Sequence, residues 1–327
     1  MKTIRIFALT VFSLVACTKI NDSNNVPASK IDSFTISMAN LSDGKESKTT
    51  FIEYGGEYNK LVWQANDQLY VTRTAAIPKH GNNFSYATFK TTTGGGTTAL
   101  FDYVEGDIPA GEGNYAVAYT GTVDFGTLDG RKFNSNHVDY AQVFIPKNQE
   151  YVENGIKANT MPMYGFGPSL NNLTLKCAGN VVRLNLYSTA ANTRINKIKL
   201  ETVDADNRSL IAGPFAIDRP ESDLIETNVN WGMWSVASYA SNIIEYDCTD
   251  SGYLSSSSET PTAFNIVISR HNSGGEKNIT ATIYYSINGG EEKTRVKVLS
   301  NLDQTQRLKL GFIFNFSAKN IADDSAW

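Results

Sequence analysis

Apolar and polar residues alternate with a period of two along much of this chain. Clear examples run from Phe34 to Met38, from Phe84 to Phe89 and from Leu173 to Cys177, and Leu61 to Trp63 is also expected to begin a strand. This period is typical of half-buried β-strands. About sixteen strand-like segments can be counted, and no stretch has a convincing amphipathic helical pattern. Many short strands separated by turn signals predict an all-β fold made of β-sandwiches.

Three local signals refine the strand pattern. Asn288-Gly289 lies between the strand segments Ile279 to Ile287 and Lys293 to Leu299, which predicts a β-hairpin with a tight turn. Strict alternation would put Ile195 and Ile198 on opposite faces, so an irregularity is expected between them. Pro214 lies inside a strand-like stretch and predicts an edge or kinked strand, because proline cannot donate to a ladder.

The N-terminus has the pattern of an export signal. Lys2 and Arg5 precede a short uncharged stretch that is too short to span a bilayer, which needs about 20 apolar residues. Leu14-Val15-Ala16-Cys17 follows and resembles the lipobox of bacterial lipoproteins. The resemblance implies cleavage between Ala16 and Cys17, acylation of Cys17 with fatty acids such as palmitate, and anchoring on a membrane surface. The alternative is an ordinary secretory peptide that contains a cysteine.

We expect two domains after this signal. Residues 1–16 are the predicted signal peptide, and residues 17–31 are polar and are expected to be a flexible tether. Residues 120–139 are predicted to form a long loop, residues 146–168 to be irregular, and residues 218–262 to be rich in loops. The domain boundary is placed after Pro168, giving an N-terminal domain over 32–168 and a C-terminal domain over 169–327.

Composition and charge narrow the function. The chain has 327 residues, 41% of them hydrophobic, so it can bury a substantial core. Its net charge of −4 does not favour nucleic-acid binding, which needs a basic patch. Cys177 and Cys248 are the cysteines left beside Cys17, and we favour buried, unpaired thiols for both over a disulfide.

No catalytic or metal-binding motif stands out. The three histidines, at positions 80, 137 and 271, show no metal-ligand spacing, so we expect no metal and no cofactor. The segment 204–207 has the acidic start of a calcium loop but lacks its glycine and its distal glutamate, which favours a solvated turn. Gly94-Gly95-Gly96 precedes no helical pattern that could hold a phosphate. These observations argue against an enzyme.

Trp231 and Trp234 are two aromatic residues in a loop-like region. Exposed indoles at these positions could stack on a sugar ring. Burial by packing is the interpretation we favour for both, and also for Trp63 and Trp327, because tryptophan is highly buried on average.

The order of several weak motifs resembles the fimbrillin (FimA/Mfa-like) family, the lipoprotein subunits of type V pili in Bacteroidales. The motifs are the lipobox, Trp63 followed by Asn66 to Val71, Ile145-Pro146-Lys147-Asn148-Gln149, Met161 to Gly165, Leu175 to Leu184, Ile195 to Leu200, Ile211 to Phe215, and Ile321-Ala322-Asp323 before the final Trp327.

This resemblance implies two tandem transthyretin-like β-sandwich domains, export as a lipoprotein, and assembly into a surface fibre. In stalk subunits of the family a trypsin-like protease cuts between the first two strands, the first strand leaves, and a strand of a neighbouring subunit replaces it. Here that strand would be Phe34 to Met38, and the loop after it holds Lys45 and Lys48 as candidate cleavage sites. No arginine occurs between Cys17 and Arg73, which favours a tip or other minor subunit.

Two functions from different classes follow. The first is a fimbrial subunit at the cell surface, with other fimbrial subunits, the outer membrane and a host or bacterial surface ligand as its partners. The second is an outer-membrane glycan-binding lipoprotein that uses Trp231 or Trp234.

Overall fold

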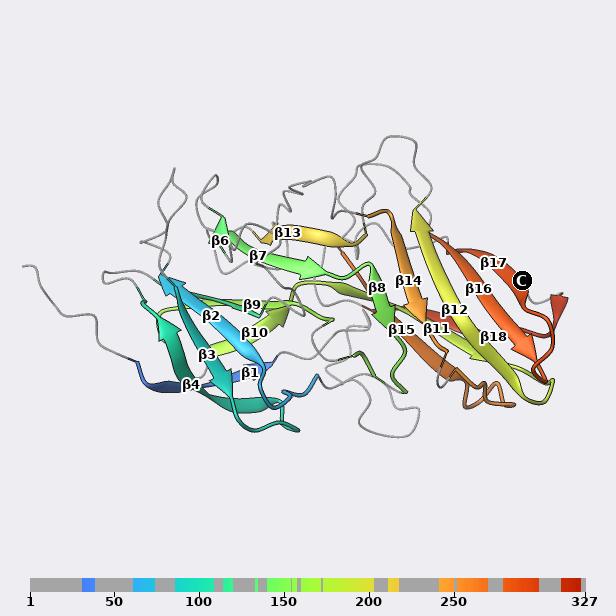
Figure 1. Cartoon of the computed structure of the whole chain (residues 1–327), viewed down its shortest axis with the longest axis horizontal. Helices are drawn as coiled ribbons and strands as arrows, with labels where there is room; N and C mark the ends of the chain where they lie inside the picture. The colour runs from blue at the N-terminus through green and yellow to red at the C-terminus, as the bar shows by residue number, and fades with distance from the viewer. Residues whose placement is uncertain are drawn as a thin grey trace, which may run out of the picture.

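A computed structural model of the chain describes its strand-rich parts (Figure 1). The described residues are 31–38, 61–73, 86–108, 114–119, 133–134, 140–153, 155–157, 160–171, 173–202, 211–217, 241–249, 252–269, 279–299 and 313–324. Within these ranges no helix is long and apolar enough to cross a membrane.

The described residues form strands and their connections, so the predicted all-β class is confirmed. The strands are β1 (Ser33–Met38), β2 (Gln68–Arg73), β3 (Ala87–Thr91), β4 (Thr98–Gly106), β5 (Tyr115–Tyr119), β6 (Phe133–Asn134), β7 (Tyr140–Ile145), β8 (Asn148–Glu150), β9 (Met163–Gly167), β10 (Leu173–Cys177), β11 (Asn180–Tyr187), β12 (Thr193–Thr202), β13 (Gly213–Ile217), β14 (Ile243–Asp247), β15 (Thr262–Ile268), β16 (Ile279–Ile287), β17 (Lys293–Leu299) and β18 (Ile313–Asn320).

Seven strands close into a barrel at the N-terminal end of the molecule. Their order is β1-β10-β9-β5-β2-β3-β4, and β4 pairs again with β1 (Figure 1). Alternate residues of each strand point inward, as the period of two predicts. Leu69, Val71, Phe89, Phe101 and Val117 are each fully buried in its core. Closure leaves no unpaired edge in this part of the sheet.

The later strands form two further sheets that pack on a common core. One has the order β15-β11-β18 and the other β17-β16-β12-β14-β8. Val182 and Phe264 from the first sheet and Ile198 and Ile283 from the second are at most 1% exposed. A small third sheet, β13-β7-β6, lies beside the junction of the barrel and these sheets (Figure 1).

All three local predictions are confirmed. β16 and β17 pair as an antiparallel hairpin, with φ of 51° at Asn288 and 69° at Gly289, the positive values that a tight two-residue turn needs. The ladder between β12 and β16 shifts register between Ile195 and Lys197, which lets both Ile195 and Ile198 point into the core. Pro214 lies in β13, an edge strand.

The predictions of irregular structure were wrong at four strands. β8 and β9 lie within 146–168, β14 lies within 218–262, and β6 lies within 120–139. β9 escaped notice because its residues do not alternate: four of its five residues are buried and two are glycines. A Cβ atom at Gly165 would come 2.8 Å from the Leu175 side chain, so glycine lets β10 pack closely against β9.

The segment from Leu61 to Trp63 was also predicted wrongly as a strand. It is bound instead to the glycine loop: the Trp63 amide donates to the Gly96 carbonyl at 2.9 Å, and the Gly95 amide donates to the Trp63 carbonyl at 2.7 Å. A Cβ atom at Gly94 would lie 2.8 Å from the Trp63 oxygen. The glycines of this loop therefore allow two backbone segments to approach closely.

Strands from the two sides of the expected boundary are interleaved. β10, beyond Pro168, belongs to the barrel, whereas β8, before Pro168, pairs with β14 in the five-stranded sheet. The division into 32–168 and 169–327, and the transthyretin-like form of each domain, stay predictions.

A buried glutamine ties the five-stranded sheet to the β15-β11-β18 sheet. Gln149 of β8 is 4% exposed, and its amide nitrogen donates to the carbonyl oxygens of Val267, at 2.7 Å, and Pro146, at 3.0 Å. Its amide oxygen accepts from the Val267 backbone nitrogen at 2.9 Å. The side chain therefore satisfies both backbone groups of one residue in β15.

We expect Gln149→Ala to lower the free energy of unfolding by about 1–3 kcal/mol, because it leaves the buried Val267 groups without partners. Urea unfolding followed by circular dichroism would measure this loss. The neighbouring exposed residue supplies the control, since Asn148→Ala should leave the midpoint almost unchanged. Equal midpoints for the two variants would contradict this role of Gln149.

Candidate functional site

The first strand seats three apolar side chains in the barrel. Phe34, Ile36 and Met38 of β1 are 2%, 0% and 8% exposed, and the residues between them face outward. β1 runs antiparallel to β4 on one side and parallel to β10 on the other. Both neighbours are distant in sequence, so β1 is held by tertiary contacts rather than by a hairpin turn.

Aromatic rings form the floor beneath β1. The Phe34 ring lies edge-on to Phe89, with centroids 4.6 Å apart, and is stacked with Phe101 at 6.3 Å. Phe101 in turn meets Trp63 at 4.8 Å. Such edge-to-face pairs add specific geometry to the burial of apolar area. The burial predicted for Trp63 is confirmed at 0% exposure, whereas Trp327 lies outside the described residues.

Loss of β1 would be costly for the barrel. Full burial of a side chain of this size stabilises the fold by about 1.5–3 kcal/mol, so the three together contribute roughly 5–9 kcal/mol. That is comparable with the whole free energy of unfolding of a typical domain, about 5–15 kcal/mol. A barrel without β1 therefore needs another strand with apolar residues at alternate positions.

An aspartate fixes the turn that places Trp63. The carboxylate of Asp67 accepts from the Gln64 backbone nitrogen at 2.7 Å and from the Tyr119 hydroxyl at 3.0 Å. Burial raises the pKa of Asp67, and these two hydrogen bonds only partly oppose that rise. Within this turn Asn66 has a φ of 76°. The motif of Trp63 followed by Asn66 to Val71 contains Asp67, but the sequence alone does not predict this structural role of its carboxylate.

The two described cysteines have buried, unpaired thiols, as expected. Burial raises the pKa of the Cys177 thiol to about 12 and raises that of Cys248 as well. Both thiols therefore stay protonated and unreactive in the folded protein near neutral pH. Among the described residues, no three histidine, cysteine or acidic side chains lie close enough together to hold a metal ion.

Most of the site residues proposed from sequence lie outside the described part of the chain. These are Ala16, Cys17, Lys45, Lys48, Trp231 and Trp234, together with the three histidines and the acidic segment 204–207. Their roles stay predictions. The structure does describe β1, the strand that precedes Lys45 and Lys48 in the sequence.

Comparisons with known proteins find similar folds but no sequence match. No family model and no curated protein matches the chain. A proposed cell adhesion protein from Bacteroides fragilis has 9% identity and a TM-score of 0.41, over 89% of this chain and 94% of that one. A fimbrial assembly protein from Parabacteroides distasonis has 10% identity and a TM-score of 0.37, over 90% and 92%.

The tip fimbrial protein Mfa3 from Porphyromonas gingivalis, solved with a C-terminal truncation, has 9% identity and a TM-score of 0.34, over 82% of this chain and 83% of that one. These three proteins are fimbrial or adhesion proteins rather than enzymes. They are of the class that the sequence resemblance names, and the likeness is one of fold at low identity.

The seating of β1 can be tested at its centre. We expect Ile36→Ser to lower the free energy of unfolding by about 2–5 kcal/mol, because it removes a fully buried aliphatic side chain and buries a hydroxyl. Thr35→Ser, one position away on the outward face, should change it by less than about 0.5 kcal/mol. Chemical denaturation of both variants is the measurement, and similar midpoints would show that β1 is not firmly seated.

Asp67 predicts a specific pH dependence. Because its pKa is raised in the folded state, the native protein holds this proton more tightly than the unfolded chain does. Wild-type stability should therefore fall, relative to Asp67→Asn, as pH rises from about 3 through the acid range, and then level off once Asp67 is ionised in both states. Denaturation of the two proteins across pH 3 to 7 tests this, and a parallel response would contradict it.

Proposed function

We propose that this protein is a fimbrial subunit of the type V pilus kind, in a tip or other minor position. It is exported as a lipoprotein with Cys17 acylated, and it is held at the cell outer membrane or in the fimbrium. Other fimbrial subunits are its partners, and the fibre assembles by β-strand addition. In this subunit the groove that β1 fills accepts a donor strand only if the chain is cut after β1. It contributes to adhesion to a host or bacterial surface.

The seating of β1 is the observation that carries this proposal. It is the first described strand, it precedes the loop with Lys45 and Lys48, and it fills a groove between two strands that are remote from it in sequence. Its three inward side chains occupy alternate positions, and a strand from another subunit with the same pattern could use the same main-chain partners.

The absence of arginine between Cys17 and Arg73 supports a minor position. A protease that requires arginine would leave β1 in place, and the barrel would stay closed to a donor strand. The subunit would then occupy an end of the fibre or its anchor, unless lysine is accepted at the cleavage site.

We expect the protein recovered from sheared surface fibres to keep its acylated N-terminus at Cys17 when the processing protease is specific for arginine. Intact-mass measurement before and after exposure to the protease would show this. The variant Ser47→Arg, between the two lysines, should create a cleavable loop and yield a delipidated product that begins at Lys48.

Two results would decide against parts of this proposal. Wild-type protein that begins just after Lys45 or Lys48 would identify a polymerising stalk subunit instead. A chain that never occurs in high-mass fibres would contradict a fimbrial role. Loss of glycan binding in Trp231→Ala or Trp234→Ala would then support the glycan-binding alternative.

A further inference from the structure

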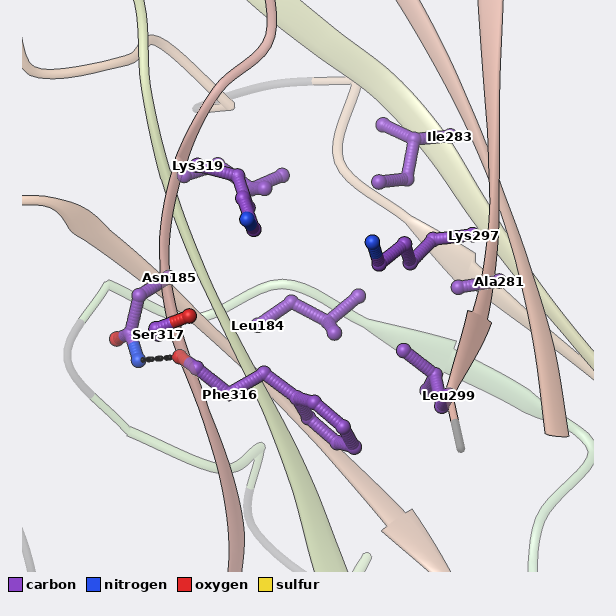
Figure 2. Close-up of a pocket in the computed structure, with 10 residues that line it drawn as sticks. Leu184, Asn185, Ala281, Ile283, Lys297, Leu299, Phe316, Ser317 and Lys319 are labelled. Carbon is purple, nitrogen blue, oxygen red and sulfur yellow. Dashed lines mark hydrogen bonds between the residues drawn. The ribbon is translucent and has the colours of Figure 1, made fainter. Parts of the chain in front are cut away.

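A cavity of about 220 Å³ opens between the edge strands of the two C-terminal sheets. β17 ends one sheet and β18 ends the other, so the two strands face each other across the seam. The floor of the cavity is apolar: Leu184 of β11 with Ala281 and Ile283 of β16, each at most 4% exposed (Figure 2). Leu299 of β17 adds a further apolar wall.

One end of the seam is fastened by opposite charges. Arg295 of β17 donates from Nε to the carbonyl oxygen of Ile321 at 3.2 Å and forms an ion pair with Asp324 just beyond β18. Lys297 follows Arg295 by two residues on β17, and Lys319 of β18 precedes Ile321 by two residues. Both lysines line the cavity. Beside the ion pair of Arg295 and Asp324, the cavity therefore has two cations.

These lysine side chains point into the space between the strands. Figure 2 shows the ammonium ends of Lys297 and Lys319 directed towards each other from opposite walls. No carboxylate is among the described residues that line the cavity, and neither lysine has an ion pair within the described part of the chain. Like charges that face each other destabilise a fold, and an anion between them would relieve this repulsion.

The strand register forces this arrangement. Ala281 of β16 stands opposite Lys297, and Ile283 stands opposite Arg295. Because Ala281 and Ile283 point into the core, their partners Lys297 and Arg295 point inward too, while Val296 and Val298 are 58% and 47% exposed. The small side chain of Ala281 leaves space beneath the lysine stem. The result is an apolar cavity with cations at its mouth.

We propose that this cavity binds a single-chain anionic amphiphile, a free straight-chain alkanoate of roughly eight carbons. Its carboxylate lies between Lys297 and Lys319, and its alkyl chain lies over Leu184 and Ile283. The size fits, because an apolar cavity of about 150 Å³ accepts the six carbons of benzene, whereas drug-sized pockets start at about 300 Å³. The charge fits as well, since charge-assisted hydrogen bonds are among the strongest in proteins.

The test uses the full purified chain with sodium octanoate as the probe, followed by calorimetry and by saturation-transfer NMR. Octanoate should bind, octyltrimethylammonium with the same tail should not, and acetate with the same head group should bind far more weakly. Lys297→Gln and Lys319→Gln should each weaken octanoate binding about tenfold. Lys293→Gln is the control, because Lys293 is exposed on the same strand and should leave binding unchanged.

A second variant tests the apolar part of the site. Ala281→Leu should fill the floor and abolish octanoate binding, and thermal unfolding would show whether the variant is folded. If Ala281→Leu does not fold, the two lysine variants still test the proposal. Equal binding of the two octyl ligands, unaltered binding in both lysine variants, or no binding of octanoate would overturn the proposal. The inward lysines would then only guard β17 and β18 against pairing with strands of a second copy.

Discussion

Closure of the barrel depends on the contact between β1 and the aromatic floor beneath it. Phe34 meets Phe89 and Phe101, and Phe101 meets Trp63, so one strand completes a cluster to which several distant segments contribute. Directly above this cluster, β1 pairs with β4 and β10 and so closes the ladder of the barrel. These neighbours are far away from β1 in sequence. The barrel therefore closes only when the first strand pairs with strands that come much later in the chain, which gives the fold a high contact order.

The barrel and the C-terminal sheets are physically continuous. β10 belongs to the barrel, and β11, which follows after two connecting residues, belongs to the β15-β11-β18 sheet. The connection passes through Ala178 and Gly179, where a Cβ atom on the glycine would come 3.0 Å from Ile145 and 3.1 Å from Val267. Apolar residues on both sides of this turn belong to a single buried cluster. The barrel and the sheet that contains β11 therefore share one hydrophobic core.

The sequence was sufficient where a strand obeys a simple rule. The alternation of β1, the Asn288-Gly289 turn, the irregularity between Ile195 and Ile198, and the edge position of Pro214 each follow from local steric or hydrogen-bonding requirements. β9 could not be recognised in this way, because it is buried on both faces and its glycines make room for a neighbouring strand. Burial on both faces removes the polar residues that make a strand visible as alternation.

The inward direction of Lys297 was equally hidden. Alternation alone would bury Val296 and Val298 and expose the charged residues of β17. Pairing with β16 instead turns the two valines outward and turns Lys297 towards the core. The functions of Gln149 and Asp67 also depend on partners far away in sequence, Val267 and Tyr119. Such roles are set by tertiary register, which no single segment encodes. The residues of the candidate cleavage loop lie outside the described part, so its geometry stays a prediction.

The mixed pairing of β1 has a consequence for symmetry. Any strand that takes its place with the same backbone hydrogen bonds must run antiparallel to β4 and parallel to β10. The replacing strand can therefore have only one orientation. A contact made in this way joins two different surfaces of successive copies. Such heterologous contacts form a closed ring if the rotation between copies closes and an open filament if it does not. A fibre assembled through this groove would therefore be polar, with chemically distinct ends.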